Sequence, residues 1–543
     1  MKSKKLDLVL RTSGLLFLFV CGSFLGCAKR GTITGGWKDT IPPIFIKALP
    51  PNFSTNFKGD QVRIYFDEYV KLKDPQKQII ISPPMDPKPN ILPMGGASKY
   101  IKIEFLDTLL ENTTYSINFG ESVTDNNEGN AFPFFRYVFS TGNELDSLKI
   151  KGSVFDALEK QIEPYVTIAL YEVNETYEDS LIFKEVPRYI TNTLDSITDF
   201  TLDNLKEGRY KLVILKDKSV NYTYEPKQDK IGFYSEIVEI PRDTAKFFDV
   251  ALFKEILPYQ PLRPKQLSRT SYIFPYEGKK DSMQIELLSQ KPEDFEYRIL
   301  ADKEKDSLYY YYKPYFEADS LIFEVTNGRY RDTLVARFKE QYRDSLKVQN
   351  LSQSTLLFDK NFTLTANTPL NSVQNELISL IDKDSVNVNF TTNLDRIENE
   401  ITFSFDRSEE NSYELQLLPE ALTDFYGNVN DTLSYGIRIP KKTDFGTIFL
   451  TLEDVKQYPV IAQITTDKGE IIAEKRIPSK ETTVFDNLQP GTYDIRVILD
   501  RNGNGVWDTG NFLEGIQPEA VFYFPEPTEV RANWELKQNF ILK

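Results

Sequence analysis

The sequence contains no histidine among its 543 residues. This absence excludes Ser-His-Asp and Cys-His catalysis, histidine-ligated zinc or iron, and a histidine pH switch. Cysteine is almost as scarce, because Cys21 and Cys27 are the only two and both lie near the N-terminus. No disulfide or thiolate cluster can therefore stabilise the rest of the chain. The sequence also lacks a glycine-rich phosphate loop, a serine elbow and a redox motif, so we expect a protein that is not an enzyme.

Positive charge is in deficit, with 65 Lys and Arg residues against 80 Asp and Glu residues and a formal net charge of −15. Because an acidic chain repels the phosphate backbone, we expect no nucleic-acid partner. The composition is 40% hydrophobic and 13% aromatic, which suffices for several cores and argues against disorder. At roughly 100–200 residues per domain, the length predicts about three to five domains.

Long apolar runs are missing too: no segment approaches ~18 consecutive apolar residues, so we expect no transmembrane helix. A short apolar stretch at residues 15–20 follows a basic start at residues 2–5. Gly26, a small residue, stands directly before Cys27. This order of basic, apolar and small residues predicts a secretory signal peptide over residues 1–26.

The end of this segment, Phe24-Leu25-Gly26-Cys27, resembles the lipobox of bacterial lipoproteins, although Phe24 stands where Leu or another aliphatic residue is usual. The resemblance implies that Cys27 is diacylated and becomes the first residue of the mature protein, followed by a tether over residues 27–40. Acyl chains on Cys27 would hold the protein at a membrane surface, because anchoring strengthens with each buried methylene. The alternative is a plain signal peptide, in which Cys27 has no such role.

The net charge of the protein also affects how it can attach to a membrane. Cleavage after Gly26 removes four basic side chains and one acidic one, which takes the net charge from −15 to −18. A body this acidic is not attracted to anionic lipid, so the lipid anchor has to hold it. Surface lipoproteins of Bacteroidota usually carry acidic residues after the cysteine, whereas Ala28-Lys29-Arg30 follows here. The resemblance therefore implies a lipid-anchored outer-membrane protein and slightly favours the periplasmic face over the cell surface.

Alternating apolar residues, interrupted by Gly, Asn, Asp and Pro, dominate the rest of the chain. Three sets have the period of two expected of a half-buried strand: Val62, Ile64 and Phe66; Ile101, Ile103 and Phe105; Tyr115, Ile117 and Phe119. Helical periodicity is scarce, and Val373 to Ile381 is the best short candidate. We predict an all-β fold of tandem antiparallel β-sandwiches.

One motif occurs twice, 283 residues apart. Residues 203–210 and 486–493 both read Asp-Asn-Leu-x-x-Gly-x-Tyr, and in each an alternating strand follows the glycine. The repeat predicts two copies of one β module, at residues 147–253 and 445–543.

Gly35-Gly36-Trp37-Lys38-Asp39, Pro42-Pro43 and Phe66 to Val70 resemble the opening of Ig-like (SbsA-type) domain lipoproteins of Bacteroidota. The resemblance continues from Thr124 to Asn130, and a weaker echo of that stretch occurs from Thr423 to Asn428. The Asn-Leu-x-x-Gly-x-Tyr repeat resembles transthyretin-like or carboxypeptidase-regulatory-type sandwiches, which are non-catalytic. The resemblances imply an Ig-like domain at 41–142, transthyretin-like sandwiches at 147–253 and 445–543 and, from the weaker echo, a second Ig-like domain at 354–441. Residues 260–348 resemble no named family, and their strand pattern predicts a fifth domain, a β-sandwich of unassigned type.

Residues 500–508, Asp-Arg-Asn-Gly-Asn-Gly-Val-Trp-Asp, form the strongest candidate for a metal site. Oxygen-bearing residues at positions one, three, five and nine, with glycine at six, have the spacing of the front of a calcium loop. The candidate calcium ligands are Asp500, Asn502, Asn504, Val506, Asp508 and Glu514, the last replacing the glutamate expected at position twelve. The alternative is a glycine- and asparagine-rich hairpin with solvated carboxylates. The equivalent loop of the first copy, residues 217–225, lacks the glycine and is the weaker candidate.

Two further patterns admit a functional and a structural interpretation. Tyr309 to Tyr312 are four consecutive tyrosines that a sugar-binding platform would use, but on a strand they divide between two faces, so we favour packing. A hydrolase using carboxylates alone would need two acidic residues converging in one pocket. Adjacent pairs such as Asp67 and Glu68 face opposite sides of a strand and do not meet this requirement.

These observations favour a non-enzymatic, membrane-anchored scaffold at the outer membrane whose partners are envelope proteins of an assembly, secretion or uptake complex. Strand edges or loops would make the contacts. The alternative is a surface-exposed glycan-binding or adhesive lipoprotein that uses tyrosine-rich loops and calcium. We expect no required cofactor, with calcium as a candidate ligand and lipid on Cys27 as the modification.

Overall fold

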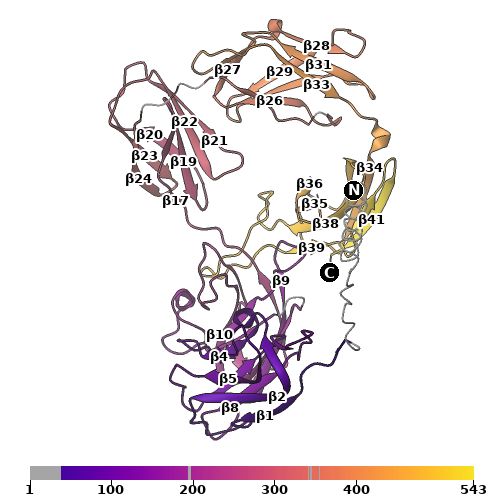
Figure 1. Ribbon diagram of the computed structural model, residues 1–543. Coiled ribbons are helices and arrows are strands. Elements are labelled where there is room, and N and C mark those ends of the chain that lie inside the picture. Colours follow the sequence, from indigo (N-terminus) through magenta and orange to yellow (C-terminus); the bar gives the residue numbers. More distant parts are fainter. Residues whose placement is uncertain (1–37, 194–196, 340–341, 343–344, 354, 543) are drawn as a thin grey trace, which may run out of the picture. The chain divides into compact units, whose positions relative to one another are not determined.

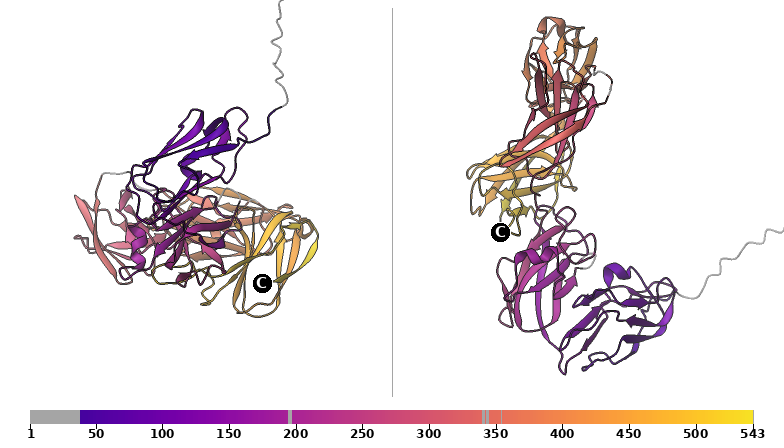
Figure 2. Two further views of the ribbon diagram at one scale, coloured as in Figure 1. Left: turned by 90° about the horizontal axis from the view of Figure 1, so that it is seen from below. Right: turned by 90° about the vertical axis from the view of Figure 1, so that its left-hand side faces the viewer.

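The computed structural model describes residues 38–193, 197–339, 342, 345–353 and 355–542. Strands account for 48% of the structure and helices for 3%, which confirms the all-β prediction (Figure 1). Figure 2 shows from two further directions that strands, rather than helices, build each part of the chain. The predicted signal peptide at 1–26 and Cys27 lie outside the described residues, as does most of the tether. Among the described residues, no helix is long and apolar enough to cross a membrane.

The chain divides into two compact units. The first ends at Asn143, and the second runs from Glu144 to the C-terminal end and also includes the short segments Ile80–Pro84 and Thr113–Ser116.

Residues 45–140 form two sheets. One has the strand order β1-β2-β5-β4, with β7 pairing with β2, and the other has the order β3-β6-β8. The elements are β1 (Phe45–Leu49), β2 (Gln61–Leu72), α2 (Pro75–Gln78), β3 (Ile80–Ser82), β4 (Asn90–Leu92), β5 (Ser98–Glu104), β6 (Thr114–Asn118), β7 (Val123–Asp125) and β8 (Arg136–Ser140). All nine residues of the three alternating sets predicted from the sequence are less than 9% exposed, which confirms their inward direction.

Residues 148–252 form a three-stranded sheet, β12-β9-β16, and a five-stranded sheet, β11-β10-β13-β14 with β15 pairing with β13. The elements are β9 (Leu148–Asp156), β10 (Thr167–Glu172), η1 (Asp179–Phe183), β11 (Tyr189–Asn192), β12 (Asp199–Leu205), β13 (Gly208–Lys216), β14 (Lys230–Phe233), β15 (Val238–Ile240) and β16 (Phe247–Leu252). The pairing is antiparallel except between β9 and β16, which run parallel. The hydrophobic core between the two sheets includes Ile150, Ile168, Leu212 and Val250.

Residues 260–337 form the sheets β17-β19-β22-β21, with β18 pairing with β19, and β20-β23-β24. The strands are β17 (Gln260–Pro261), β18 (Lys265–Ser268), β19 (Ser271–Glu277), β20 (Gln284–Leu287), β21 (Glu296–Ala301), β22 (Ser307–Lys313), β23 (Ser320–Asn327) and β24 (Tyr330–Arg337). The core is rich in aromatic residues, among them Tyr272, Phe274, Tyr310, Tyr312 and Phe323.

Residues 348–438 form the sheets β25-β26-β30-β29, β27-β32 and β28-β31-β33. The elements are β25 (Val348–Asn350), β26 (Phe362–Ala366), β27 (Leu370–Val373), η2 (Asn375–Leu377), β28 (Ile378–Asp382), β29 (Phe390–Asp395), β30 (Glu400–Phe405), β31 (Ser412–Leu417), β32 (Leu422–Asp424) and β33 (Leu433–Arg438). The helix considered for Val373 to Ile381 is wrong: only a 3₁₀ turn forms there, because Ile378 and Leu380 are buried as alternate residues of a strand.

Residues 446–541 repeat the architecture of residues 148–252. Their sheets are β37-β34-β41 and β36-β35-β38-β39, with β40 pairing with β38, and β34 and β41 run parallel as β9 and β16 do. The elements are η3 (Lys442–Asp444), β34 (Gly446–Glu453), β35 (Val460–Thr465), β36 (Ile471–Ile477), β37 (Thr482–Leu488), β38 (Gly491–Leu499), β39 (Val521–Tyr523), β40 (Thr528–Val530) and β41 (Glu535–Ile541). Residues 148–252 and 446–541 thus share one strand order, and they are called here the first and second repeat.

The motif itself builds the same turn in both repeats. Asn204 and Asn487 both have a positive φ, 59° and 56°, a conformation that asparagine tolerates better than most residues. The hydroxyl of Tyr210 donates a hydrogen bond to the backbone oxygen of Lys206, four residues upstream, at 3.0 Å. The arrangement resembles the tyrosine corner of other sandwiches, in which a tyrosine hydroxyl bonds back to the upstream chain.

The weaker echo between Thr124–Asn130 and Thr423–Asn428 also has a structural basis. The carboxylate of Asp125 accepts hydrogen bonds from four backbone amides of the loop that follows it. Asp424 accepts bonds from the amides of Tyr426 and Asn428 in the corresponding loop. Gly129 and Gly427 have nearly equal positive φ angles of 81° and 83°, so the two loops share one turn geometry.

Candidate functional site

The predicted calcium loop connects β38 to β39 in the second repeat. Asp500 follows directly after β38 and its side chain is completely buried. Its two carboxylate oxygens each accept a backbone hydrogen bond of 3.0 Å, one from Asn504 and one from Gly505. The guanidinium Nε of Arg476 lies 3.7 Å from Oδ2 of the same carboxylate. Asp500 therefore organises the loop by capping its amides.

The structure brings three other predicted ligands together. Oδ2 of Asp508 accepts hydrogen bonds from the side-chain amides of Asn502, at 2.6 Å, and Asn504, at 2.9 Å. The backbone amide of Val506 donates to Oδ1 of Asn504. Five of the six predicted residues thus lie in one hydrogen-bonded loop.

Glu514, the sixth predicted ligand, is exposed, and its amide donates to Asn511. The glutamate that meets the loop is instead Glu519, which is 2% exposed. Its Oε1 accepts from the amide of Arg501 at 2.6 Å, and its Oε2 accepts from the amide of Asp508 at 3.1 Å. Calcium-loop spacing does not predict this residue. The signal lies in strand pairing, because the amide of Leu499 donates a hydrogen bond to the backbone oxygen of Ala520 and so brings Glu519 to the start of the loop that follows Leu499.

The loop differs from the open hairpin with solvated carboxylates that was the alternative to a metal site, since Asp500 and Glu519 are both buried. Within the described part of the chain, no group of three or more acidic or cysteine side chains converges as metal ligands would. Backbone and side-chain amides hold the loop carboxylates in this structure. Calcium binding at residues 500–508 stays a prediction.

The corresponding loop of the first repeat uses the same two capping positions. Asp217 accepts from the amides of Val220 and Tyr222, both at 2.7 Å, as Asp500 accepts from its own loop. Asp229, which is fully buried, accepts from the amide of Lys218 at 3.0 Å, as Glu519 accepts from Arg501. Burial raises the pKa of Asp229 above its ordinary value. The pair of carboxylates is therefore a shared structural feature of the repeat.

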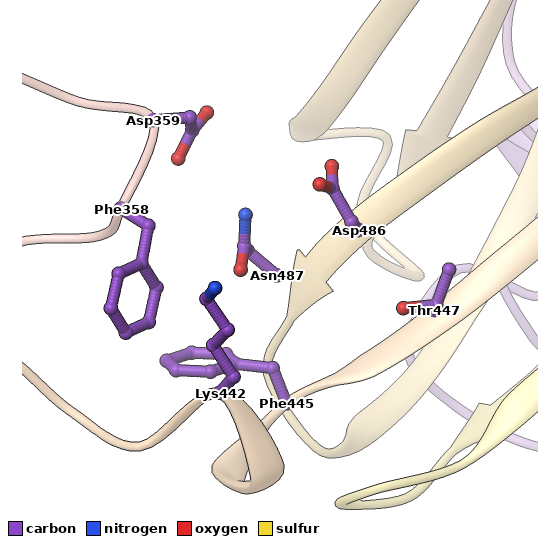
Figure 3. A pocket seen from close by; sticks show the side chains of 7 residues that line it. All are labelled: Phe358, Asp359, Lys442, Phe445, Thr447, Asp486 and Asn487. Carbon is purple, nitrogen blue, oxygen red and sulfur yellow. The ribbon is translucent and has the colours of Figure 1, made fainter. Parts of the chain in front are cut away.

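A pocket of about 440 Å³ lies where the segment 354–441 meets the second repeat (Figure 3). It is lined by Phe358, Asp359, Lys442, Phe445, Thr447, Asp486 and Asn487. The ammonium of Lys442 lies 5.4 Å from the centre of the Phe358 ring, a cation–π distance. Asp486 and Asn487 come from the repeated motif, so one copy of that motif faces a cavity.

The pocket contains two carboxylates, those of Asp359 and Asp486, which is the minimum that a carboxylate-only hydrolase needs. Both side chains are exposed to solvent. The aromatic rings, the carboxylates and the amide of Asn487 are instead groups that recognise a polar ligand through stacking and hydrogen bonds.

The four consecutive tyrosines of β22 do not form an exposed platform. Tyr310 and Tyr312 point into the core of their own sandwich and are fully buried. Tyr311 is 6% exposed, packs with Phe425, and donates a hydrogen bond to the backbone oxygen of Asn367 at 3.0 Å. The prediction of packing is therefore correct, and the second face of the strand serves a contact between neighbouring sandwiches.

Comparison with known proteins finds one family match. Residues 39–141 match the family described as bacterial Ig-like domain. No curated protein matches the chain. Among solved structures it is similar to tandem Ig repeats of Dlar, at 10% identity over 34% of this chain and 97% of that one, with a TM-score of 0.13. Another is the S-layer protein rSbsC(31-844), at 10% identity over 90% of this chain and 67% of that one, with a TM-score of 0.14.

The I9-I11 tandem from titin is also similar, at 9% identity over 52% of this chain and 100% of that one, with a TM-score of 0.12. Identities and scores this low carry no argument about function. The family match identifies a bacterial Ig-like domain at residues 39–141, and the strand pairing shows that the rest of the described chain is also built of β-sheets.

Proposed function

We propose that the protein is a non-catalytic scaffold that lipid on Cys27 anchors in the outer membrane, with envelope proteins as its partners. The observation that carries the scaffold proposal is that neighbouring sandwiches of the second unit contact one another through buried side chains. Tyr311 against Phe425 is one such contact. Contacts of this kind hold sandwiches in defined positions, as a scaffold requires, whereas flexible linkers alone would not.

The sequence at the N-terminus supports the anchoring part of the proposal. A basic start, an apolar stretch and Gly26 before Cys27 are the signals of lipoprotein export, and the acidic body gives no electrostatic alternative for membrane attachment. The Ala28-Lys29-Arg30 sequence favours the periplasmic face.

Cys27→Ser tests the anchor, and Cys21→Ser is the matched control because Cys21 lies within the expected signal peptide. Labelling with a fatty-acid analogue and membrane fractionation should show lipid and membrane association in wild type and in Cys21→Ser, and neither in Cys27→Ser. Label that persists in Cys27→Ser would refute the anchor. Cross-linking in intact cells, followed by purification of the lipidated protein, would then identify the partners.

The pocket beside Asn487 favours a second candidate, a glycan-binding lipoprotein on the cell surface. Phe358 offers an aromatic ring, and Asp486 and Asn487 offer hydrogen-bonding groups, on the same cavity. Protease treatment of intact cells separates the two proposals, because only a surface protein would be digested without lysis. Binding of oligosaccharides that disappears in a Phe358→Ala, Asp486→Ala double variant would support the second one.

A further inference from the structure

A loop of the second repeat places one buried aromatic side chain against the first repeat. Residues 509–517, named here the docking loop, are closed by two backbone hydrogen bonds of 2.8 Å between Asn511 and Ile516. Phe512 lies between these two residues and is only 2% exposed. It belongs to an apolar cluster whose other members include Tyr224, Phe233 and Phe253 of the first repeat. Its ring meets that of Phe233 edge-on, with centroids 5.3 Å apart.

Polar contacts fix the position of the docking loop. The amide of Phe512 donates to Oε1 of Glu255 at 2.6 Å, and the hydroxyl of Thr509 donates to the backbone oxygen of Lys254 at 2.7 Å. The side-chain amide of Gln517 donates to the backbone oxygen of Phe233 at 2.8 Å. These hydrogen bonds come from both sides of Phe512 in the sequence, so they fix the position of its aromatic side chain.

Steric fit adds to this specificity. A Cβ atom on Gly510 would lie 2.5 Å from Cζ of Phe253, which is closer than carbon atoms pack. The docking loop therefore needs glycine at this position to approach the first repeat.

The contact is reciprocal, because a loop of the first repeat lies on the second. Nζ of Lys160 is 2.6 Å from Oδ1 of Asp494 in β38. The backbone oxygen of Leu158 accepts hydrogen bonds from the hydroxyl of Tyr523, at 2.7 Å, and from the guanidinium of Arg496, at 3.3 Å. Arg496 is 4% exposed, so this carbonyl satisfies a buried charged group.

We infer that the docking loop and residues 158–160 lock the two repeats together. Residues 258–441 are then an insertion between two repeats that stay in contact with each other. The inference goes beyond the proposed scaffold role and does not depend on the lipid anchor. The entropic cost of closing a loop grows only slowly with its length, so a long insertion does not prevent the contact. The repeats then open and unfold as one unit, although two sandwiches separate them in sequence.

Hydrogen exchange of the full chain tests this inference. Phe512→Asp places a charge in the apolar cluster around Phe512. We expect hydrogen exchange of the β14 amides, at residues 230–233, to accelerate at least tenfold. Leu513→Asp is the matched control, because Leu513 is the next residue of the same loop and is 58% exposed; its effect should stay within twofold. Equal exchange in β14 for Phe512→Asp and wild type would overturn the inference.

A measurement on the unmodified chain guards against simple misfolding of the variant. Zero-length carbodiimide coupling should join Lys160 to Asp494, detected by mass spectrometry of the linked peptides. Lys230 and Asp156, 2.7 Å apart within the first repeat, are the positive control, and Asp156 is less exposed than Asp494. Coupling of the control pair without coupling of Lys160 to Asp494 would also overturn the inference.

Discussion

The hydroxyl of Tyr493 donates a hydrogen bond of 2.8 Å to the backbone oxygen of Gln489 in the turn that leads into β38. Tyr210 makes the same bond to Lys206 in the first repeat. The conserved spacing of Asn, Gly and Tyr in the two motifs thus has one structural cause. The asparagine takes the left-handed turn, and the tyrosine ties the strand back to it.

Tyr493→Phe removes this hydrogen bond and keeps the ring, so we expect the free energy of unfolding of the second repeat, together with the first repeat that is locked to it, to fall by about 1 kcal/mol. Two of the three tryptophans, Trp507 and Trp534, lie in this repeat, so the change in tryptophan fluorescence during urea unfolding reports mainly on it. Tyr458→Phe, at a half-buried position of the same repeat, is the control and should have a smaller effect. Equal effects of the two substitutions would show that the hydrogen bond from Tyr493 makes no specific contribution to stability.

The Ig-like domain at residues 39–141 should lose stability in acid through Asp125. Burial opposes ionisation of this carboxylate, but the four backbone amides that bond to it hold its pKa below the ordinary value. Its contribution is therefore complete above the unfolded pKa of about 4 and is lost as the pH falls through the lowered folded pKa. Hydrogen exchange of this domain between about pH 2 and 5 should show the loss, and Asp125→Asn should reduce this pH dependence. Asp60→Asn, at an exposed position, should leave the pH dependence in place.

Calcium should raise the melting temperature of the second repeat, and Asp500→Ala should abolish that rise. Comparing Glu519→Gln with Glu514→Ala shows which of the two glutamates contributes to calcium binding. Because Glu519 is buried against the loop and Glu514 is exposed, we expect Glu519→Gln to reduce the calcium effect more strongly. If the wild-type chain melts at the same temperature with calcium and with chelator, the metal proposal should be dropped.

Gly152 in β9 has no room for a side chain. A Cβ atom there would lie 2.1 Å from the backbone oxygen of Phe248 and 2.6 Å from Cζ of Phe200. We expect Gly152→Ala to destabilise the first repeat by at least about 2 kcal/mol, because the parallel strand would have to move. Gly436 in β33 has no atom within 4 Å of such a Cβ, so Gly436→Ala should be neutral or slightly stabilising in its own domain. Hydrogen exchange of β9 and β33 measures both effects in the full chain.

Strand patterns and repeats were readable from the chain because both are local. Val62, Ile64 and Phe66 alternate at the period of a strand, and their burial follows from that period. The Val373 to Ile381 segment misled the interpretation, since apolar residues in a short window fit a turn and a strand as well as a helix. For the calcium loop, spacing alone selected Glu514, while the pairing of β38 with β39 brought Glu519 to the loop.

By itself the sequence determined that this is an all-β protein with a duplicated motif, and it excluded histidine chemistry and disulfide bonds within the body of the chain. These properties depend on composition, on a period of two, and on a motif confined to eight residues. Only the tertiary structure decided that Phe512 lies in the first repeat, that Tyr311 packs on Phe425, and which glutamate meets residues 500–508. Such contacts join residues tens to hundreds of positions apart, and their energy depends on complementary surfaces that no local pattern encodes.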